Sequence, residues 1–230
     1  MRRFLILVCL LAASVCRPAI AAADSLSFTS LGSGSWINLK IGSVTETGWA
    51  GEINWNMTAG GVTKAVTTYC GDLFDDAKLP VELGTLKTTA AVDADPTISH
   101  GALPQAGSAA AYLVNTYGAG VHGNSIQSAA LQIAIWQAMF GAASFTVLNT
   151  TANYAAITNA LSGFQLPGGS FSAVAGYFDV ANGSAIGSAA NGQDQVIVGT
   201  PEPATILLLL LATVGMLGYS RRLKLQPTRR

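Results

Sequence analysis

Apolar residues recur with helical spacing most clearly over residues 124–141. At 100° per residue, Ile126 lies on the opposite face of such a helix from Ile135, and apolar residues occupy both faces. A helix that is apolar on nearly all sides is expected to be buried. Asn124 supplies a capping side chain and Gly141 a stop signal, so we predict a buried helix between them.

Four segments before this helix are rich in β-branched and aromatic residues, which favour strands. The glycines of Ala59-Gly60-Gly61 mark a hairpin between the last two segments, so we expect antiparallel neighbours. Trp36, Trp49 and Trp55 are expected to give one face of the sheet a large buried area. The four segments span residues 25–30, 35–44, 48–57 and 62–69.

Two further helices and two later strands complete the layout. We expect the helices over residues 105–117 and 150–162 and the strands over 171–180 and 195–198, with 72–96 as a solvated connection that lacks calcium-loop spacing. The predicted fold class is therefore α+β, an antiparallel β-sandwich or barrel-like body with a three-helix insertion. One exported domain covers residues 24–199, with strands over 25–69, the helical block over 105–162 and strands over 171–198.

The N-terminal residues have the three parts of a secretory signal peptide. Met1-Arg2-Arg3 is basic, residues 4–15 are apolar, and small residues precede residue 24. We expect residues 1–23 to be removed on export, with cleavage after Ala21 or Ala23.

The charge of the chain is divided unevenly between its ends and its middle. Formal charge is zero overall, but eight of the twelve basic residues lie in the two terminal segments. Between residues 24 and 203 four lysines face all twelve acidic residues, a net charge of about −8 with no arginine. Nucleic-acid binding needs clustered Lys and Arg, so it is not expected.

A single cysteine and two scattered histidines also lack metal-ligand spacing, so no metal or cofactor is expected.

Gln132 lies inside the apolar helix and needs partners. Burying a primary amide without them costs about 1–3 kcal/mol. Trp136 follows at i+4, where its ring could cover the amide and keep water away. One interpretation is a core glutamine that is hydrogen-bonded to a neighbouring strand. The other interpretation requires a cysteine, and Cys70 at the end of the strand over 62–69 is the candidate.

Two short segments resemble the thioester domains of bacterial surface adhesins. In that family a cysteine after an aromatic residue is joined to the glutamine of a Gln-x-Ala-Ile-Trp segment. Leu131 stands here where the adhesins often carry threonine. The residues that match are Tyr69, Cys70, Gln132, Ala134, Ile135 and Trp136. The resemblance implies a thioester between Cys70 and Gln132, supported by the other four residues.

The chemistry explains why the resemblance needs these residue types. A cysteine thiolate attacks the carboxamide carbon of glutamine, ammonia leaves, and the thioester stores an acyl group for a later nucleophile. Water is the competing nucleophile, so a dry apolar wall is essential. The buried helix and Trp136 are expected to supply that wall.

Cys70 is the only cysteine that the exported protein keeps, because Cys9 and Cys16 leave with the signal peptide. An intramolecular disulfide is therefore impossible. A free thiol is vulnerable in an oxidising compartment, which favours the thioester interpretation. A buried inert thiol and an intermolecular disulfide are the alternatives.

Residues 200–230 resemble a PEP-CTERM sorting signal. Pro201-Glu202-Pro203 precedes an apolar run over residues 206–219, and Arg221 and Arg222 begin the basic cluster that closes it. On physical grounds this segment is a C-terminal membrane stop with its basic cluster on the cytoplasmic side. The structural alternative to a sorting signal is an ordinary single-pass anchor.

The sorting resemblance implies a route and a set of partners. It implies export across the inner membrane of a Gram-negative, biofilm-forming bacterium and cleavage near Pro201-Glu202-Pro203 by an exosortase. The resemblance also implies that the C-terminal helix holds the chain in the inner membrane before processing, and that the processed protein belongs to the cell surface or extracellular matrix. Proteins with such a tail are commonly associated with extracellular polysaccharide.

Three functions follow from different classes of chemistry. The first is a cell-surface or matrix protein whose Cys70–Gln132 thioester captures an amine or hydroxyl on a polymer or surface ligand. The second is a non-covalent structural or binding protein of the matrix with the same sorting route. The third is a secreted cysteine hydrolase that pairs Cys70 with His100 or His122, oriented by Asn124. We expect one of the first two, so the protein is not expected to be an enzyme.

Overall fold

The computed structural model describes residues 24–59, 61–73, 81–94, 105–167, 177–181 and 195–197. By its internal contacts the chain divides into two units, Met1–Val198 and Gly199–Arg230, and all described residues belong to the first. The expected signal peptide and the sorting segment, with Pro201, Glu202, Pro203, Arg221 and Arg222, lie outside the described residues. Within the described ranges, no helix has the length and apolar character needed to cross a membrane.

Three long strands begin the fold, and they pair as antiparallel neighbours, as expected. They are β1 (Asp24–Ile41), β2 (Val44–Ala59) and β3 (Val62–Cys70). The sequence predicted two strands where β1 runs as one, because irregularities in register at Phe28/Ser30 and Leu31/Gly34 let the strand continue past its glycines. At the second irregularity the two backbones approach closely: a Cβ on Gly51, whose φ is +146°, would lie 2.3 Å from the Ser33 carbonyl oxygen.

The solvated connection predicted over residues 72–96 is wrong for its second half. That part forms β4 (Val81–Thr88) and the short helix α2 (Thr89–Asp93), with the Thr88 hydroxyl capping the helix at the Ala91 N–H. A second strand that was not predicted is β5 (Phe145–Val147), which pairs with the far end of β1. Both strands are held by distant residues of β1, so no local pattern marked them.

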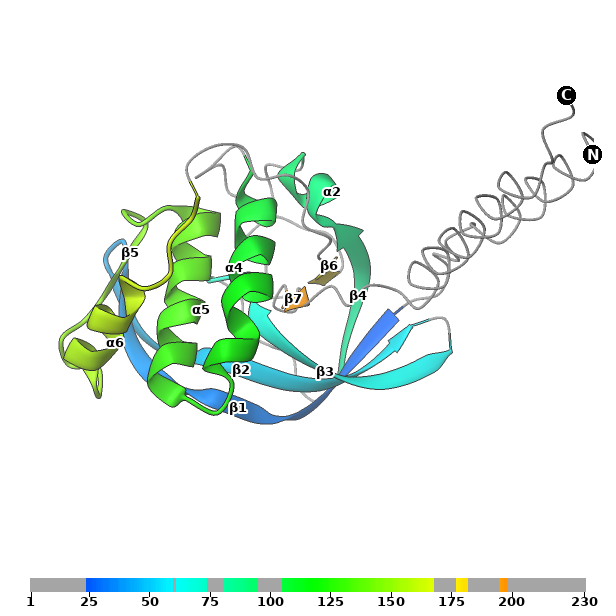
Figure 1. Cartoon of the computed structure of the whole chain (residues 1–230), viewed down its shortest axis with the longest axis horizontal. Helices are drawn as coiled ribbons and strands as arrows, with labels where there is room; N and C mark the ends of the chain where they lie inside the picture. Colours follow the sequence, from blue (N-terminus) through cyan, green and yellow to red (C-terminus); the bar gives the residue numbers. More distant parts are fainter. Residues whose placement is uncertain are drawn as a thin grey trace, which may run out of the picture. The chain divides into compact units, whose positions relative to one another are not determined.

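The strand pairings run in a closed ring. The later strands β6 (Tyr177–Ala181) and β7 (Gln195–Ile197) complete it in the order β2–β3–β7–β6–β4–β1, and β1 pairs again with β2. All of these pairings are antiparallel. The other halves of β1 and β2 extend beyond the ring as a two-stranded ribbon, which lies below the helices in Figure 1. An α+β fold with an antiparallel sheet is therefore what the chain forms.

Three longer helices follow β4: α4 (Ala106–Val121), α5 (Ser125–Phe140) and α6 (Tyr154–Leu161). The expected buried helix is confirmed in α5, where the Asn124 side chain accepts a hydrogen bond from the Gln127 N–H and Gly141 ends the helix at φ 86°. The predicted end of the first helix at residue 117 is wrong, because α4 continues to Val121. α6 is shorter than predicted and begins after Asn153, which has a left-handed φ of 59°.

Two apolar cores lie in the described part of the molecule. The larger joins α4 and α5 to the ribbon of β1 and β2 and includes Ile37 and Leu39. The smaller, around Trp55, lies among β1 and β2 residues that pair near the closure of the ring. Trp55 is buried as expected, but the expectation for Trp36 is wrong, because 56% of its surface is exposed.

Candidate functional site

Three residues of α5 line up with the chain from Tyr69 to Asp72. They are spaced four residues apart, so they share one face of the helix. Gln132 and Trp136 make hydrogen bonds to that segment of chain, at the end of β3 and just beyond it, and the Ser128 side chain lies next to the Tyr69 side chain. The three contacts pair Ser128 with Tyr69, Gln132 with Cys70, and Trp136 with Asp72. We call this line of contacts the α5 seam.

The two residues expected to form the thioester meet in the middle of the α5 seam. The Cys70 N–H donates to Gln132 Oε1 at 2.8 Å, and Gln132 Nε2 donates to the Cys70 carbonyl at 2.7 Å. Cys70 is 1% exposed and Gln132 is 0% exposed, so water does not compete for either group. The register of β2 with β3 ends at the Glu52–Tyr69 pair, one residue before Cys70, and the Gln132 carboxamide takes a strand's place there.

The sulfur of Cys70 faces the main chain of Asp72. The thiol donates to the Asp72 carbonyl, and the Asp72 N–H lies 3.3 Å from Sγ. Trp136 Nε1 donates to the same carbonyl at 3.2 Å, and Trp136 is buried against Phe145 in an edge-to-face contact. The structure therefore brings Trp136 to the sulfur side of the pair. Ala134 and Ile135 are also buried in α5, among the residues of the larger core.

The carboxamide of Gln132 and the sulfur of Cys70 have different partners. Hydrogen bonds to both main-chain polar groups of Cys70 hold the carboxamide beside the strand. A strand side chain stands roughly perpendicular to the sheet, and the sulfur of Cys70 contacts the main chain of Asp72.

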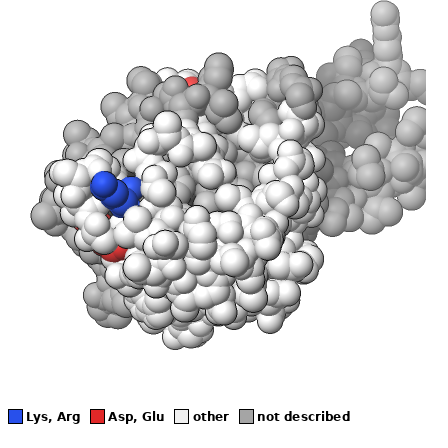
Figure 2. All heavy atoms as spheres, turned by 90° about the vertical axis from the view of Figure 1, so that its left-hand side faces the viewer, with Lys and Arg blue, Asp and Glu red and all other residues white. Residues whose placement is uncertain are grey.

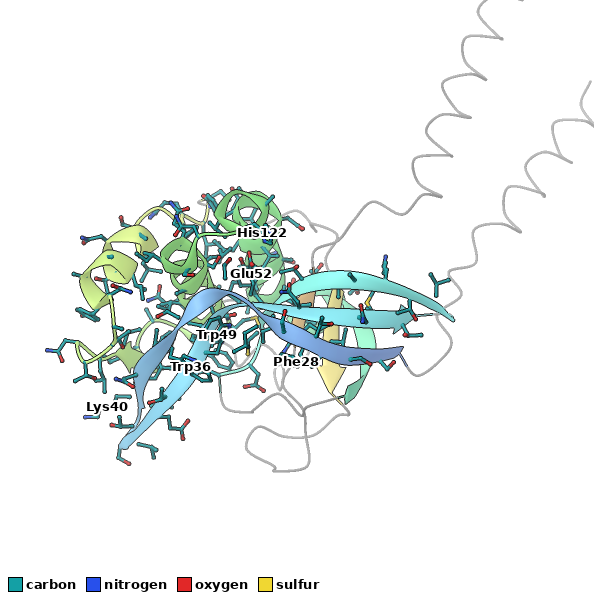
Figure 3. All side chains as sticks on the ribbon, turned by 90° about the horizontal axis from the view of Figure 1, so that it is seen from below. Phe28, Trp36, Lys40, Trp49, Glu52 and His122 are labelled. Atoms are coloured by element: carbon teal, nitrogen blue, oxygen red, sulfur yellow. The ribbon has the colours of Figure 1, made fainter. Side chains whose placement is uncertain are left out.

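A buried carboxylate lies next to the seam and was not predicted. Glu52 is 1% exposed, and it accepts hydrogen bonds from the Ser33 N–H at 3.1 Å and from the Tyr69 hydroxyl at 3.5 Å. His122 Nδ1 lies 3.1 Å from both carboxylate oxygens, while the histidine side chain is 69% exposed. Figure 3 shows Glu52 and His122 side by side. Burial raises the pKa of the Tyr69 hydroxyl, and the Glu52 charge raises it further, so Tyr69 stays protonated.

The sequence did not reveal Glu52 as a buried residue, because the alternation of side chains along the strand places it on a face that is expected to be exposed to solvent. Alternation places Glu52 on the same side as Asn54 and Asn56, which reads as a polar outer face. In the structure helix α5 packs against β2, and Glu52 is buried while Asn56 is exposed. The pairing of Glu52 with Tyr69 is the signal that could have found it, but that pairing requires the register of β2 with β3.

A second buried glutamine also lies beside Cys70. Gln195 of β7 is directly opposite Cys70 in the sheet, and its Oε1 accepts a hydrogen bond from the Thr68 hydroxyl at 2.7 Å. Thr68 in turn accepts a hydrogen bond from Trp55 Nε1 at 3.0 Å. Gln195 is therefore held through its side chain by Thr68, whereas the Gln132 carboxamide is held by Cys70 itself. This contrast makes Gln195 a natural control for Gln132.

The residues proposed for a cysteine hydrolase have other roles in the described part of the chain. His122 is bonded to Glu52, and Asn124 caps α5. His100 lies outside the described residues. No group of three or more His, Cys, Asp or Glu that could hold a metal ion is found among the described residues.

Comparison of the chain with protein-family models, with curated proteins and with solved structures finds no match.

Proposed function

We propose that the chain is an exported cell-surface or matrix protein that forms an internal thioester between Cys70 and Gln132 and uses it to capture a nucleophile. The observation that carries the proposal is the pair of hydrogen bonds between the Gln132 carboxamide and the Cys70 main chain. They hold the carboxamide beside the only cysteine of the described residues, in a site from which water is excluded.

The sulfur, the main-chain N–H and the main-chain carbonyl of Cys70 each have a role in the bond-forming step. Sγ attacks the Gln132 carbonyl carbon, and negative charge develops on Oε1, to which the Cys70 N–H already donates. The Cys70 carbonyl holds the amide nitrogen that must leave. The C–N bond breaks as the C–S bond forms, and the thiol proton leaves with the nitrogen as ammonia. The product is a thioester whose carbonyl oxygen would accept a hydrogen bond from the Cys70 N–H.

In the capture of a ligand, sulfur is the leaving group and the ligand supplies the nucleophile. An amine or hydroxyl attacks the thioester carbonyl, its oxygen or nitrogen becomes bonded to the Gln132 carbon, and Cys70 recovers its proton as a thiol. Each chain carries one acyl group and reacts once, so the protein is a covalent adhesin and not an enzyme. The chemical class of partner is a polymer or surface ligand that presents an amine or a hydroxyl.

The two ends of the sequence support the route by which the protein reaches such partners. The signal peptide over residues 1–23 and the sorting segment over 200–230 would direct export, temporary anchoring in the inner membrane and processing by an exosortase. The acidic, arginine-free region between residues 24 and 203 is unsuited to nucleic acid.

A second candidate is a non-covalent binding protein of the same matrix. The same two hydrogen bonds give the oxygen and one N–H of Gln132 their partners, as expected for a core glutamine that continues the pairing of β3 beyond β2. In that case Cys70 is a buried, inert thiol.

Intact-mass measurement of protein purified after expression of the full chain distinguishes the two candidates. A thioester lowers the mass by one ammonia, and the deficit should disappear in Cys70→Ala and in Gln132→Glu but persist in Gln195→Glu. Methylamine should replace the deficit with an adduct on Gln132. Full mass with a thiol that titrates after denaturation would refute the thioester and leave the binding protein.

A further inference from the structure

The exposed side of the ribbon formed by β1 and β2 carries an aromatic platform. Trp36 is 56% exposed although it lies in a paired part of the strand, directly opposite Trp49. The two rings meet edge to face, with centroids 5.6 Å apart and planes at 71°. Figure 3 shows the two rings next to each other on the ribbon. An indole that keeps more than half of its surface in water is a large area available to a ligand.

The platform is rigid before any ligand arrives. Trp49 is fixed by the hydrogen bond from its Nε1 to the Glu52 carbonyl at 3.1 Å, and Trp36 rests against Trp49. Both residues belong to the part of the β1–β2 ladder that pairs without irregularity, from Gly34 opposite Gly51 to Ile41 opposite Val44. Little conformational entropy is therefore lost when a flat ligand stacks on the Trp36 ring.

A row of neutral polar groups lies beside the platform on the same face. Asn38 follows Trp36 by two residues, and Thr47 is its cross-strand partner, so both share the face of the tryptophans. The Thr47 hydroxyl donates to Asn38 Oδ1 at 2.7 Å, and Asn38 Nδ2 donates to the Thr150 hydroxyl at 3.0 Å. By strand geometry this row lies about 7 Å from Trp36, which is close to the width of one sugar ring.

The scarcity of charged side chains near Trp36 limits the classes of ligand that the platform can bind. Lys40 is the first charged residue along this face of β1 after Trp36, and Figure 3 shows it at the far end of the ribbon. Figure 2 shows that charged atoms are sparse on the end of the molecule it presents. Anionic polymers and lipid surfaces require clustered basic residues, which this region lacks. A ligand with an apolar face, hydroxyl groups at its edge and no charge fits the platform and its polar row.

We propose that Trp36 and the Asn38–Thr47–Thr150 row form a binding site for a neutral polysaccharide, with one sugar ring stacked on Trp36 and its hydroxyls bonded to the row. The site stands on the face of the ribbon and does not require the Cys70–Gln132 thioester. Where the thioester also forms, the site would hold a polymer that bears hydroxyl acceptors.

Affinity electrophoresis of the full chain tests the site, with dextran, a soluble β-glucan and a galactomannan as neutral probes and alginate as an anionic one. At least one neutral polymer should retard the protein, and Trp36→Ala should weaken that binding at least about tenfold. Val62→Ala removes a comparably exposed apolar side chain from another hairpin and should bind normally. Circular dichroism of each variant checks that it is folded.

Three outcomes would overturn the site. They are retardation of the wild-type protein by none of the neutral polymers, equal retardation of Trp36→Ala, and binding to alginate alone. Cys70→Ala should bind the neutral polymer as the wild type does, so failure of the thioester and failure of this site give different results.

Discussion

The main chain of Cys70 holds both ends of the Gln132 carboxamide, with its N–H on Oε1 at 2.8 Å and its carbonyl on Nε2 at 2.7 Å. The residues are 62 positions apart in the sequence, and both are buried. The glutamine side chain thus makes the two hydrogen bonds to Cys70 that the main chain of a neighbouring strand would otherwise make. The geometry is that of a hydrogen-bonded core amide, and it is also the arrangement from which the proposed thioester would form.

We predict that Trp136→Phe affects stability and the thioester together. The change keeps an aromatic ring but removes the hydrogen bond from Nε1 to the Asp72 carbonyl, so the free energy of unfolding should fall by about 1 kcal/mol. Loss of the contact next to the sulfur should also speed hydrolysis of a thioester, followed by release of titratable thiol. Trp55→Phe removes an equivalent indole hydrogen bond to Thr68 and should lower stability similarly without speeding hydrolysis.

Glycine is required at residue 51, and we predict that Gly51→Ala severely destabilises the protein. Its φ of +146° is unfavourable for any L side chain, and the new Cβ would lie 2.3 Å from the Ser33 carbonyl oxygen. Urea unfolding should show a loss of about 3 kcal/mol or more. Gly48→Ala is the matched control, because it lies in the same strand with nothing within 4 Å of its Cβ position, and its effect should stay within about 0.5 kcal/mol. Equal effects at the two sites would contradict this account.

The two members of the Glu52–His122 pair should contribute very unequally. Glu52→Ala leaves the Ser33 N–H and the Tyr69 hydroxyl without their acceptor in a buried site, so we expect a loss of about 2–3 kcal/mol in unfolding free energy. His122→Ala removes a side chain that is 69% exposed, and solvent screening should keep its effect below about 1 kcal/mol. Thermal unfolding of both variants measures the two losses of stability. A larger loss for His122→Ala than for Glu52→Ala would contradict the prediction.

Tyr69 should make the folded protein sensitive to alkali. Its pKa is raised in the folded state, mainly by burial and then by the charge of Glu52. Its contribution is therefore complete below its unfolded pKa of about 10 and is lost as pH rises beyond that value, because only the unfolded chain ionises. Measured in a Cys70→Ala background, stability should fall less steeply above pH 10 in Tyr69→Phe than in its parent. Equal slopes in the two proteins would contradict this account.

Local signals predicted the central helix and its partner well. α5 has its apolar periodicity, its Asn124 cap and its Gly141 stop within one short segment. The resemblance to thioester domains pointed to Cys70 as the neighbour of Gln132, and the two residues do meet. The β4 and β5 strands depend on β1 residues that are far away in sequence, so the sequence suggested only a connection. The burial of Glu52 and the exposure of Trp36 depend on where α5 covers the ribbon, which alternation along β2 and β1 does not encode.

The proposed thioester between Cys70 and Gln132 would affect the mechanical stability of the protein. A covalent bond between residues 62 apart closes a large loop, and such a cross-link stabilises a fold by about 4 kcal/mol through the entropy of the unfolded chain. Transfer of the acyl group to an acceptor would open that loop and remove the cross-link. The protein that has reacted with its ligand would then unfold at lower force than the protein that still holds its thioester. Each covalent attachment would therefore lower the mechanical stability of the attached protein.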